Sequence, residues 1–586
     1  MPKTMKPVDA VMIGVGWTGG IIARELTKAG LNVVGLERGD FRNTNPDFLT
    51  PGVHDELAYA VRNKLFQNPA RDTLSFRNNV RETALPIRQF GSFLPGDGLG
   101  GAGVHWNGLT WRFLENEFKL RSNSIAKYGA GVLGEDCTTQ DWGITYQDIE
   151  QDYDRFEYLC GISGKAGNLD GKKIAGGNVF EGPRKREYPN PPLKHSYSQE
   201  MFRKGMTEIG LHPFVSPSAN NSRAYKNTEG IQMGPCAYCG YCERFGCEMS
   251  AKGSLQTTLL PILLKEPKFE LRCNSHVLKI NVDSTGKKAT GVTYLDATGN
   301  EVIQPADIVF LTAFSLNNVH LLLLSGIGKA YDPATGQGVI GKNYTYQTGT
   351  SATLFYEGKH FNPFMGAGSL AMGIDDYNGD NFDHAGLDFI GGGVISQSTS
   401  GGRPIQYHPV PKGTPRWGAA WKAAAAKYYN SSFGWGAQGS VQAYRGNYLD
   451  LDPTYRNEHG QPLMRLTFDW GKHERKFSDW LGGKYEAMVK VLNPQSSIIS
   501  TLSQHYSIVP YQSTHNTGGA IMGSDPSKSA VNTYMQVWDV PNVFSMGASA
   551  FPQNAGYNPT GTVGALAFRT ADAVTKRYVK NPGLLT

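Results

Sequence analysis

The sequence predicts an α/β fold, and two observations near its N-terminus carry that prediction. An apolar run at 8–13, a helical pattern at 18–28 and a second apolar run at 31–36 follow one another in the order strand, helix, strand. A glycine-rich pattern occupies the turn between the first strand and the helix, and an acidic residue follows the second strand. This arrangement is typical of a dinucleotide-binding unit.

The glycine pattern consists of Gly14, Gly16 and Gly19, and the acidic residue is Glu37. These glycines allow a tight turn and let backbone N–H groups approach a pyrophosphate at the helix N-terminus. The carboxylate can accept a hydrogen bond from a ribose hydroxyl. Arg38 comes next and could meet the 2′-phosphate of NADP, so these residues alone leave NAD(P) and FAD both open.

Length and composition exclude several classes of protein. The 586 residues suffice for about three domains. The net charge of +6 is small for this length, so we expect no nucleic-acid partner. No stretch reaches the roughly 18 apolar residues of a membrane-spanning helix. The N-terminal apolar stretch superficially resembles a signal peptide, but Asp9 and several glycines interrupt it, and we expect no export signal in it.

A second glycine-dense segment covers 98–108 and contains Gly100, Gly101, His105 and Asn107. So many glycines let backbone amides approach a flat or anionic ligand, which the two polar side chains could contact. The alternative is a simple loop with a histidine buried in the core.

The rest of the chain alternates between ordered and loop-rich regions. We expect strands at 268–282, 290–295, 308–312 and 542–546. The region 116–225 reads as polar and loop-rich. Its basic run, 184–186, is expected on a solvated face.

The C-terminal region contains a third candidate ligand site. His515 precedes a glycine-rich turn, Gly547 and Ala548 follow the expected strand, and Asn558 to Thr560 open a helix through 573. A turn that leads into a helix N-terminus can bind an anion or the edge of a ring.

Four of the seven cysteines lie within twelve residues, as Cys236, Cys239, Cys242 and Cys247. This spacing differs by one residue from that of bacterial ferredoxins and favours an iron–sulfur cluster. Zinc sites more often use two cysteine pairs separated by a long loop, so zinc is less favoured, as are purely structural cysteines. Four thiols by themselves fit a four-iron cluster.

Taken together, the first glycine pattern, the His105-Trp-Asn107 loop, His515 and Asn558 resemble the glucose–methanol–choline (GMC) oxidoreductases from end to end. The resemblance implies FAD rather than NAD(P), bound by a Rossmann-like domain. It further implies a discontinuous substrate domain that contains an antiparallel sheet, with an iron–sulfur insertion. The expected FAD-binding segments are 1–115, 226–345 (which includes the cysteine loop) and 511–586, and the expected substrate segments are 116–225 and 346–510.

The resemblance also implies functional roles for particular residues. The reaction would be alcohol oxidation, with His515 as the general base and Asn558 hydrogen-bonded to the same hydroxyl; the alternative role of Asn558 is to cap the following helix. Some members of the family bind FAD covalently through a histidine placed like His105, so a covalent link is an open alternative here. The expected cofactor-binding residues are Gly14, Gly16, Gly19, Glu37, Arg38, Gly100, Gly101, His105, Asn107, Val277, Ala313, Gly547, Ala548, Asn558 and Thr560.

The cysteine run narrows the resemblance, because most members of the family lack one. Together with 444–453 and the tail from Asn558, it resembles bacterial flavoprotein subunits that oxidise a secondary alcohol of gluconate or 2-ketogluconate. Such subunits work with a small export or chaperone subunit and a multihaem cytochrome c. We therefore expect a periplasmic complex that contacts the membrane through a partner. Related members hold three-iron clusters, so a 3Fe-4S cluster is expected and a 4Fe-4S cluster stays open.

Several alternatives remain at this point. The same apparatus could act on glucose, sorbitol or C3 of a glycoside, or reduce O₂ directly as an oxidase, and the chain could instead be a non-catalytic electron carrier. A sugar acid calls for a cation in the pocket. The candidates are Arg403, Lys412, Arg416 and Arg445.

Overall fold

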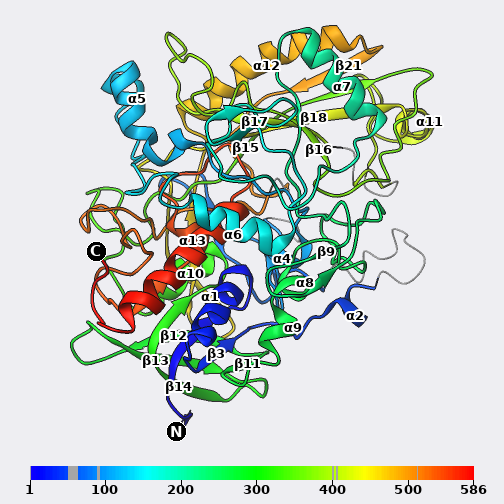
Figure 1. The fold of residues 1–586 in the computed structure, drawn as a ribbon. Helices are drawn as coiled ribbons and strands as arrows, with labels where there is room; N and C mark the ends of the chain where they lie inside the picture. The colour runs from blue at the N-terminus through cyan, green and yellow to red at the C-terminus, as the bar shows by residue number, and fades with distance from the viewer. Residues whose placement is uncertain (1, 50–63, 89–92, 399–400, 404–406, 511–512) are drawn as a thin grey trace.

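The computed structural model describes residues 2–49, 64–88, 93–398, 401–403, 407–510 and 513–586. Two sheets organise this part of the chain, one in each half of the molecule (Figure 1). The first sheet has the strand order β11-β3-β2-β14-β13-β12, and β1 and β22 also pair with β14. The bounds are Lys3–Thr4 (β1), Val8–Ile13 (β2), Val33–Leu36 (β3), Phe269–Arg272 (β11), His276–Val282 (β12), Ala289–Leu295 (β13), Glu301–Leu311 (β14) and Val543–Ser545 (β22).

The predicted strand–helix–strand unit is confirmed. Strands β2 and β3 pair in parallel, and α1 (Trp17–Lys28) connects them, one residue longer at its start than predicted. The turn requires its glycines. Gly14 has φ +93°, and a Cβ on Gly19 would lie 2.3 Å from the Gly14 carbonyl oxygen. A side chain at either position would therefore strain or displace the turn.

The long expected strand at 268–282 forms two strands, with β11 parallel to β3 and β12 antiparallel to β13. The C-terminal strand and helix are present as β22 and α13 (Thr560–Ala573). Helix α13 packs between α1 and α6 (Glu150–Cys160). The chain's two ends thus meet in one domain.

The second sheet is antiparallel throughout, as the resemblance implies. Its strand order is β21-β15-β18-β17-β16-β8. Helices α7 (Tyr197–Glu208) and α12 (Lys472–Leu492) cover one face (Figure 1), and Phe202, Trp435 and Tyr485 are buried in the core beneath them. The strand bounds are Phe214–Val215 (β8), Thr348–Phe355 (β15), Ala371–Ile374 (β16), Gly393–Ser398 (β17), Ser432–Gly439 (β18) and Ser496–Ser500 (β21). The domain boundaries themselves stay a prediction.

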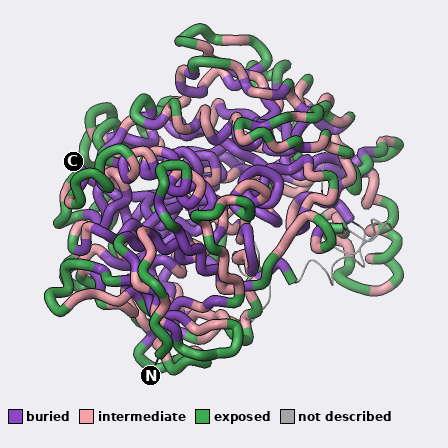
Figure 2. Tube along the Cα trace, turned by 60° about the horizontal axis from the view of Figure 1, so that its bottom comes forward, coloured by how far each residue is buried: buried purple, intermediate pink, exposed green. Residues whose placement is uncertain are grey.

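Smaller elements complete the described fold. A four-stranded sheet has the order β19-β20-β4-β5. Figure 2 shows buried segments through the interior of both halves and exposed ones on the outer loops. Within the described residues, no helix is long and apolar enough to cross a membrane. The remaining bounds are Thr44–Asp47 (α2), Ser75–Arg77 (β4), Leu85–Pro86 (β5), Ala102–His105 (α4), Glu115–Lys119 (η2), Leu120–Tyr128 (α5), Ala130–Val132 (η3), Asn168–Leu169 (β6), Lys172–Lys173 (β7), Tyr225–Lys226 (β9), Gln232–Met233 (β10), Leu255–Thr258 (α8), Leu260–Leu263 (α9), Ser315–Leu324 (α10), Gly418–Tyr428 (α11), Tyr448–Arg456 (β19), Pro462–Thr467 (β20), Gly547–Ala550 (η4) and Val574–Tyr578 (η5).

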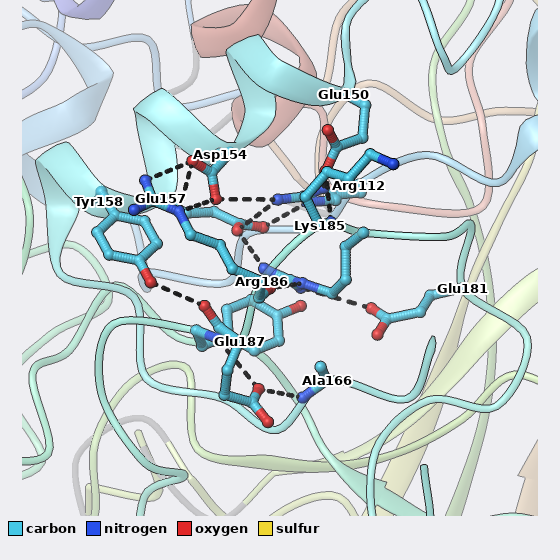
Figure 3. Close-up of polar contacts among 12 residues, drawn as sticks. Arg112, Glu150, Asp154, Glu157, Tyr158, Ala166, Glu181, Lys185, Arg186 and Glu187 are labelled. Atoms are coloured by element: carbon cyan, nitrogen blue, oxygen red, sulfur yellow. Dashed lines mark hydrogen bonds and ion pairs between the residues drawn. The ribbon is translucent and has the colours of Figure 1, made fainter. Parts of the chain in front are cut away.

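The region 116–225 is more ordered than predicted. Its longest helices, α6 and α7, were missed, and α6 shows why: its buried face carries a charged residue, Glu157, which interrupts the apolar period. Glu157 pairs with Arg112 through two hydrogen bonds of 2.8 Å (Figure 3). It also pairs with Arg184. Arg184 is fully buried, so the prediction of a solvated face was wrong for this member of the basic run.

Candidate active site

A cavity of about 650 Å³ is lined by residues from both sheets. It brings together nearly all the predicted cofactor-binding and catalytic residues, although they come from distant parts of the chain. Gly19 is the exception. It does not line the cavity but packs against Gly14, where it allows the tight turn. The predicted residues that line the cavity are Gly14, Gly16, Glu37, Arg38, Gly100, Gly101, His105, Asn107, Val277, Ala313, His515, Gly547, Ala548, Asn558 and Thr560.

The two predicted glycine-rich loops contact each other at one wall of this cavity. The Gly100 N–H donates to the Val15 carbonyl at 2.9 Å, and a Cβ on Gly16 would lie 3.6 Å from the Gly100 oxygen. Glu37 accepts hydrogen bonds from the backbone N–H groups of Val15 and Gly39, each at 3.0 Å. Burial raises the pKa of Glu37, and these two N–H groups oppose that shift.

Arg38 is already paired. Its guanidinium donates to Asp72 at 2.6 Å and lies 4.0 Å from Asp97. Two carboxylates thus oppose its charge, which disfavours the binding of a 2′-phosphate beside it.

His105 lies buried in the cavity wall with one ring nitrogen unused. Its Nε2 has no hydrogen-bond partner among the described residues. The ring makes an edge contact with Phe66 at a centroid distance of 4.6 Å. Burial first, and then the charge of Lys252, lower the pKa of His105 to about 3, so the imidazole is neutral at pH 7. A neutral ring with a free nitrogen at a cavity wall can bond to a ligand.

His515 and Asn558, which are 43 residues apart in sequence, contact each other in the cavity wall. His515 Nε2 lies 3.1 Å from Asn558 Nδ2, and His515 Nδ1 is hydrogen-bonded to Gln347 Oε1. The Trp111 indole N–H donates to Asn558 Oδ1 at 2.9 Å. Burial lowers the pKa of His515 to about 4, so this imidazole is also neutral at pH 7 and can accept a proton.

Strands β17 and β18 line the cavity with neutral polar groups. These are Ser396, Ser398 and Gln438, which the sequence prediction missed because nothing in their local pattern distinguishes them from other strand residues. Gln438 pairs in register with Gly349, two residues beyond Gln347, so it lies close to the His515 end.

Among the described residues, none of the four basic side chains considered for a sugar acid lines this cavity. Arg403 is buried elsewhere. It donates to the Gly240 carbonyl at 2.5 Å and lies over the rings of Tyr241 and Phe245. Its contacts hold the cysteine loop. Lys412 and Arg416 are exposed.

The four clustered cysteines lie in one loop as free thiols. The Tyr238 N–H points to Cys236 Sγ at 3.4 Å, and Asn220 Nδ2 points to Cys242 Sγ at 3.5 Å. Burial, reinforced by the neighbouring thiols, raises the pKa of Cys236 to about 12. Among the described residues, however, no three His, Cys, Asp or Glu side chains are grouped closely enough to hold a metal ion.

The cysteine loop packs directly against the second glycine-rich loop. The Arg244 N–H donates to the His105 carbonyl at 2.7 Å. The fully buried Lys252 donates to three carbonyls, those of Trp106, Cys242 and Phe245, at 2.7 to 2.8 Å. The loop that contains the cysteines therefore packs against the loop that places His105 in the cavity wall.

Comparisons with known proteins agree with this geometry. Models of the GMC oxidoreductase family match residues 193–348 and 443–567. The gluconate 2-dehydrogenase flavoprotein of Pantoea cypripedii is 48% identical over 99% of this chain and 95% of its own length. The fructose dehydrogenase large subunit of Gluconobacter japonicus is 23% identical over 97% of both chains.

Among solved structures, pyridoxine 4-oxidase from Mesorbium loti superposes with a TM-score of 0.60. The superposition covers 98% of this chain and all of that one, at 14% identity, and so supports the fold alone. The full-length similarity to the Pantoea flavoprotein, together with the two model matches, is what identifies the family. The chain belongs to the GMC oxidoreductases and is an FAD-dependent enzyme that acts on CH–OH groups.

Proposed function

We propose that this enzyme is a dehydrogenase that oxidises a secondary alcohol of a sugar acid, gluconate or 2-ketogluconate. One observation carries the proposal: a neutral imidazole, His515, faces the amide of Asn558 at 3.1 Å in the wall of the cavity that the expected FAD-binding residues line. The identity to the Pantoea flavoprotein supports the substrate class.

The cavity fits FAD. The N-terminus of α1 and the adjoining glycines offer backbone N–H groups to a pyrophosphate, and Glu37 is placed to accept from a ribose hydroxyl. His105 and Trp17 both line this cavity, and neither His105 Nε2 nor the Trp17 indole N–H has a hydrogen-bond partner among the described residues. When bound, FAD supplies the acceptor for the hydride that leaves the carbinol carbon.

The chain's own residues handle the hydroxyl proton. His515 Nε2 accepts it, because the buried imidazole is unprotonated at pH 7. Asn558 Nδ2 donates a hydrogen bond to the hydroxyl oxygen and so holds the alcohol in line. The short contact between Nε2 and Nδ2 means that one hydroxyl can engage both groups.

A second candidate substrate class is favoured by the polar groups that β17 and β18 add to the cavity. The polar side chains from β17 and β18 are neutral, and none of the four basic candidates reaches the cavity in the described part of the chain. An uncharged sugar or polyol, such as glucose, sorbitol or a glycoside oxidised at C3, would need only hydrogen bonds from such groups. Direct use of O₂ as an oxidase is the further alternative.

We extend the proposal to an onward electron path through an iron–sulfur cluster, with 3Fe-4S favoured over 4Fe-4S. The cysteine spacing carries this step, because the described thiols are not grouped closely enough to hold a metal ion in this structure. The thiols come from one loop, and N–H groups point at two of the sulfurs, those of Cys236 and Cys242. Lys252 is fully buried beside this loop. Three backbone carbonyls accept from its amine, and cysteine thiolates bound to iron would add negative charge beside it. Cys236, Cys239, Cys242 and Cys247 are the candidate ligands.

The electron acceptor and location are part of the same proposal. A one-electron relay suits a multihaem cytochrome c subunit, and the Pantoea relative is itself described as the flavoprotein of its enzyme. A small export or chaperone subunit would complete a periplasmic complex. Membrane contact would then come from a partner subunit.

Replacing His515 by Ala should lower turnover by a factor on the order of 10²–10⁴ with FAD retained, because the base is lost. In the wild type the rate should fall only as the pH approaches the His515 pKa of about 4, because protonation there removes the base. Steady-state rates against pH check both statements. The exposed His505 provides the control variant His505→Ala, and equal rates in the two variants would remove His515 from this role.

His105 is proposed to bind FAD covalently through its free Nε2. After acid precipitation, the flavin absorbance should stay with the wild-type polypeptide and pass into the supernatant for His105→Ala. Complete release from the wild type would exclude the covalent link while leaving His105 as a contact.

Replacing Cys239 by Ser should leave substrate-driven flavin reduction intact and abolish reduction of cytochrome c, since the relay loses a ligand. Iron analysis and electron paramagnetic resonance should show loss of the cluster signal. Cys137→Ser, at an isolated cysteine, is the matched control. Rapid cytochrome reduction by the Cys239 variant would refute the relay.

A further inference from the structure

Gln347 holds the side of His515 that faces away from Asn558. It lies one residue before β15, only 3% exposed, and its Oε1 is hydrogen-bonded to His515 Nδ1. Its Nε2 donates to the backbone carbonyl of Tyr557 at 3.2 Å. A carbonyl oxygen can only accept, so the amide nitrogen must face Tyr557 and the amide oxygen must face His515. His515 Nδ1 therefore carries the hydrogen.

The other side of His515 leads to the same assignment by an independent route. An indole N–H can only donate, so the Trp111 contact fixes Asn558 Oδ1 toward the tryptophan. Asn558 Nδ2 must then face His515 Nε2, to which it donates. His515 Nε2 is thus the nitrogen without a hydrogen, and its lone pair accepts from Asn558 until an alcohol enters. In the opposite tautomer, the N–H of His515 Nε2 would face the N–H of Asn558 Nδ2 at 3.1 Å. The bare Nδ1 would then face Gln347 Oε1, so two acceptors would be in contact.

We propose that Gln347 is a positioning residue that fixes His515 in the Nδ1–H tautomer and so directs the basic Nε2 lone pair at the substrate hydroxyl. Trp111 performs the matching task for Asn558. The proposal rests on the proposed function, since it concerns the same base, and it extends to residues that neither the family pattern nor the sequence spacing assigned.

Tyr557 connects the residues that orient His515 and Asn558. Its carbonyl accepts from Gln347, and its ring stacks on Trp111 with centroids 4.9 Å apart and planes 16° apart. Its hydroxyl donates to the buried Asp375, which also accepts from Asn178 at 2.5 Å and Asn378 at 2.9 Å. Displacing one member therefore disturbs the geometry at both His515 and Asn558.

The tautomer decides whether proton transfer can occur. When an alcohol enters, its O–H donates to Nε2 and its oxygen accepts from Asn558 Nδ2. The O–H bond then breaks, Nε2 gains the proton, and the carbon's hydride passes to FAD, so that the alcohol loses two electrons and two hydrogens. An imidazole protonated at Nε2 could not take this proton.

The titratable groups near His515 do not change its charge at neutral pH, so they do not alter the tautomer assigned above. Tyr346 and Tyr557 pack nearby, with Asp375 behind Tyr557. Burial is the cause of the lowered His515 pKa, and no charged side chain contributes to it. The ring is neutral across the neutral pH range, so its tautomer, rather than its charge, is what the surrounding amides control.

The test compares Gln347→Met, which keeps the length but removes the acceptor, with Gln347→Glu, which retains an oxygen acceptor for Nδ1–H in either protonation state. Anaerobic flavin reduction should slow on the order of 10–10²-fold in Gln347→Met, with little change in the substrate concentration for half-maximal rate. Gln347→Glu should recover most of that loss. Gln397→Met, a buried β17 glutamine outside the cavity, should stay within about twofold of the wild type.

A second measurement needs no substrate. The ¹⁵N spectrum of histidine-labelled holoenzyme, with His515→Ala for assignment, should show a protonated Nδ1 and a bare Nε2 in the wild type and in Gln347→Glu. A mixture of tautomers is expected in Gln347→Met.

A wild-type His515 protonated at Nε2 would overturn the proposal, as would equal reduction rates in wild type and Gln347→Met, or equal losses in the Met and Glu variants. Failure of every sugar acid and polyol to reduce the wild-type flavin would instead remove the proposed function, and the ¹⁵N result would still decide the role of Gln347.

Discussion

The site depends on how β14 joins the two ends of the chain. The C-terminal half of this strand pairs in parallel with β2 and also with β22, so residues near 10 and near 544 lie in one sheet. The glycine turn leaves β2, Ala313 follows β14, and Gly547 follows β22, which brings three strand ends to one edge. In parallel sheets ligands bind at such carboxyl ends. The cavity for FAD is therefore a consequence of strand order.

The second sheet contributes the remaining residues of the site. Strand β15 brings Gln347 to His515, and β17 and β18 add neutral polar groups to the cavity wall. Burial keeps His515 neutral, and two amides with fixed orientations determine which of its nitrogens is basic. The arrangement suits removal of a hydroxyl proton. Lys252 connects the loop of His105 to the cysteine loop, which would shorten the proposed path for single electrons.

The sequence predicted the parts of the fold that depend on interactions between residues close together in the chain. The glycine turn, its flanking strands and α13 could be found because turn geometry and apolar periodicity act within a few residues. Helix α6 was missed because buried Glu157 is neutralised by Arg112 and Arg184, which lie far away in sequence.

The same limit applies to the site. His515 and Asn558 could be proposed from a family resemblance, but Gln347 and Trp111 act only through tertiary hydrogen bonds and leave no local pattern. Arg403 was one of four candidates for binding a substrate carboxylate, and it is buried against Tyr241 and Phe245. Whether an arginine faces a pocket or a neighbouring ring depends on packing that spacing does not encode.

We propose that a sugar acid reduces the bound flavin with His515 as the base. The most direct measurement is the anaerobic visible spectrum of the purified holoenzyme before and after adding gluconate, with glucose and sorbitol in parallel. The account predicts oxidised flavin bands that gluconate bleaches. Flavin bands that gluconate and 2-ketogluconate leave unchanged, while an uncharged sugar bleaches them, would contradict the sugar-acid assignment and favour an uncharged substrate.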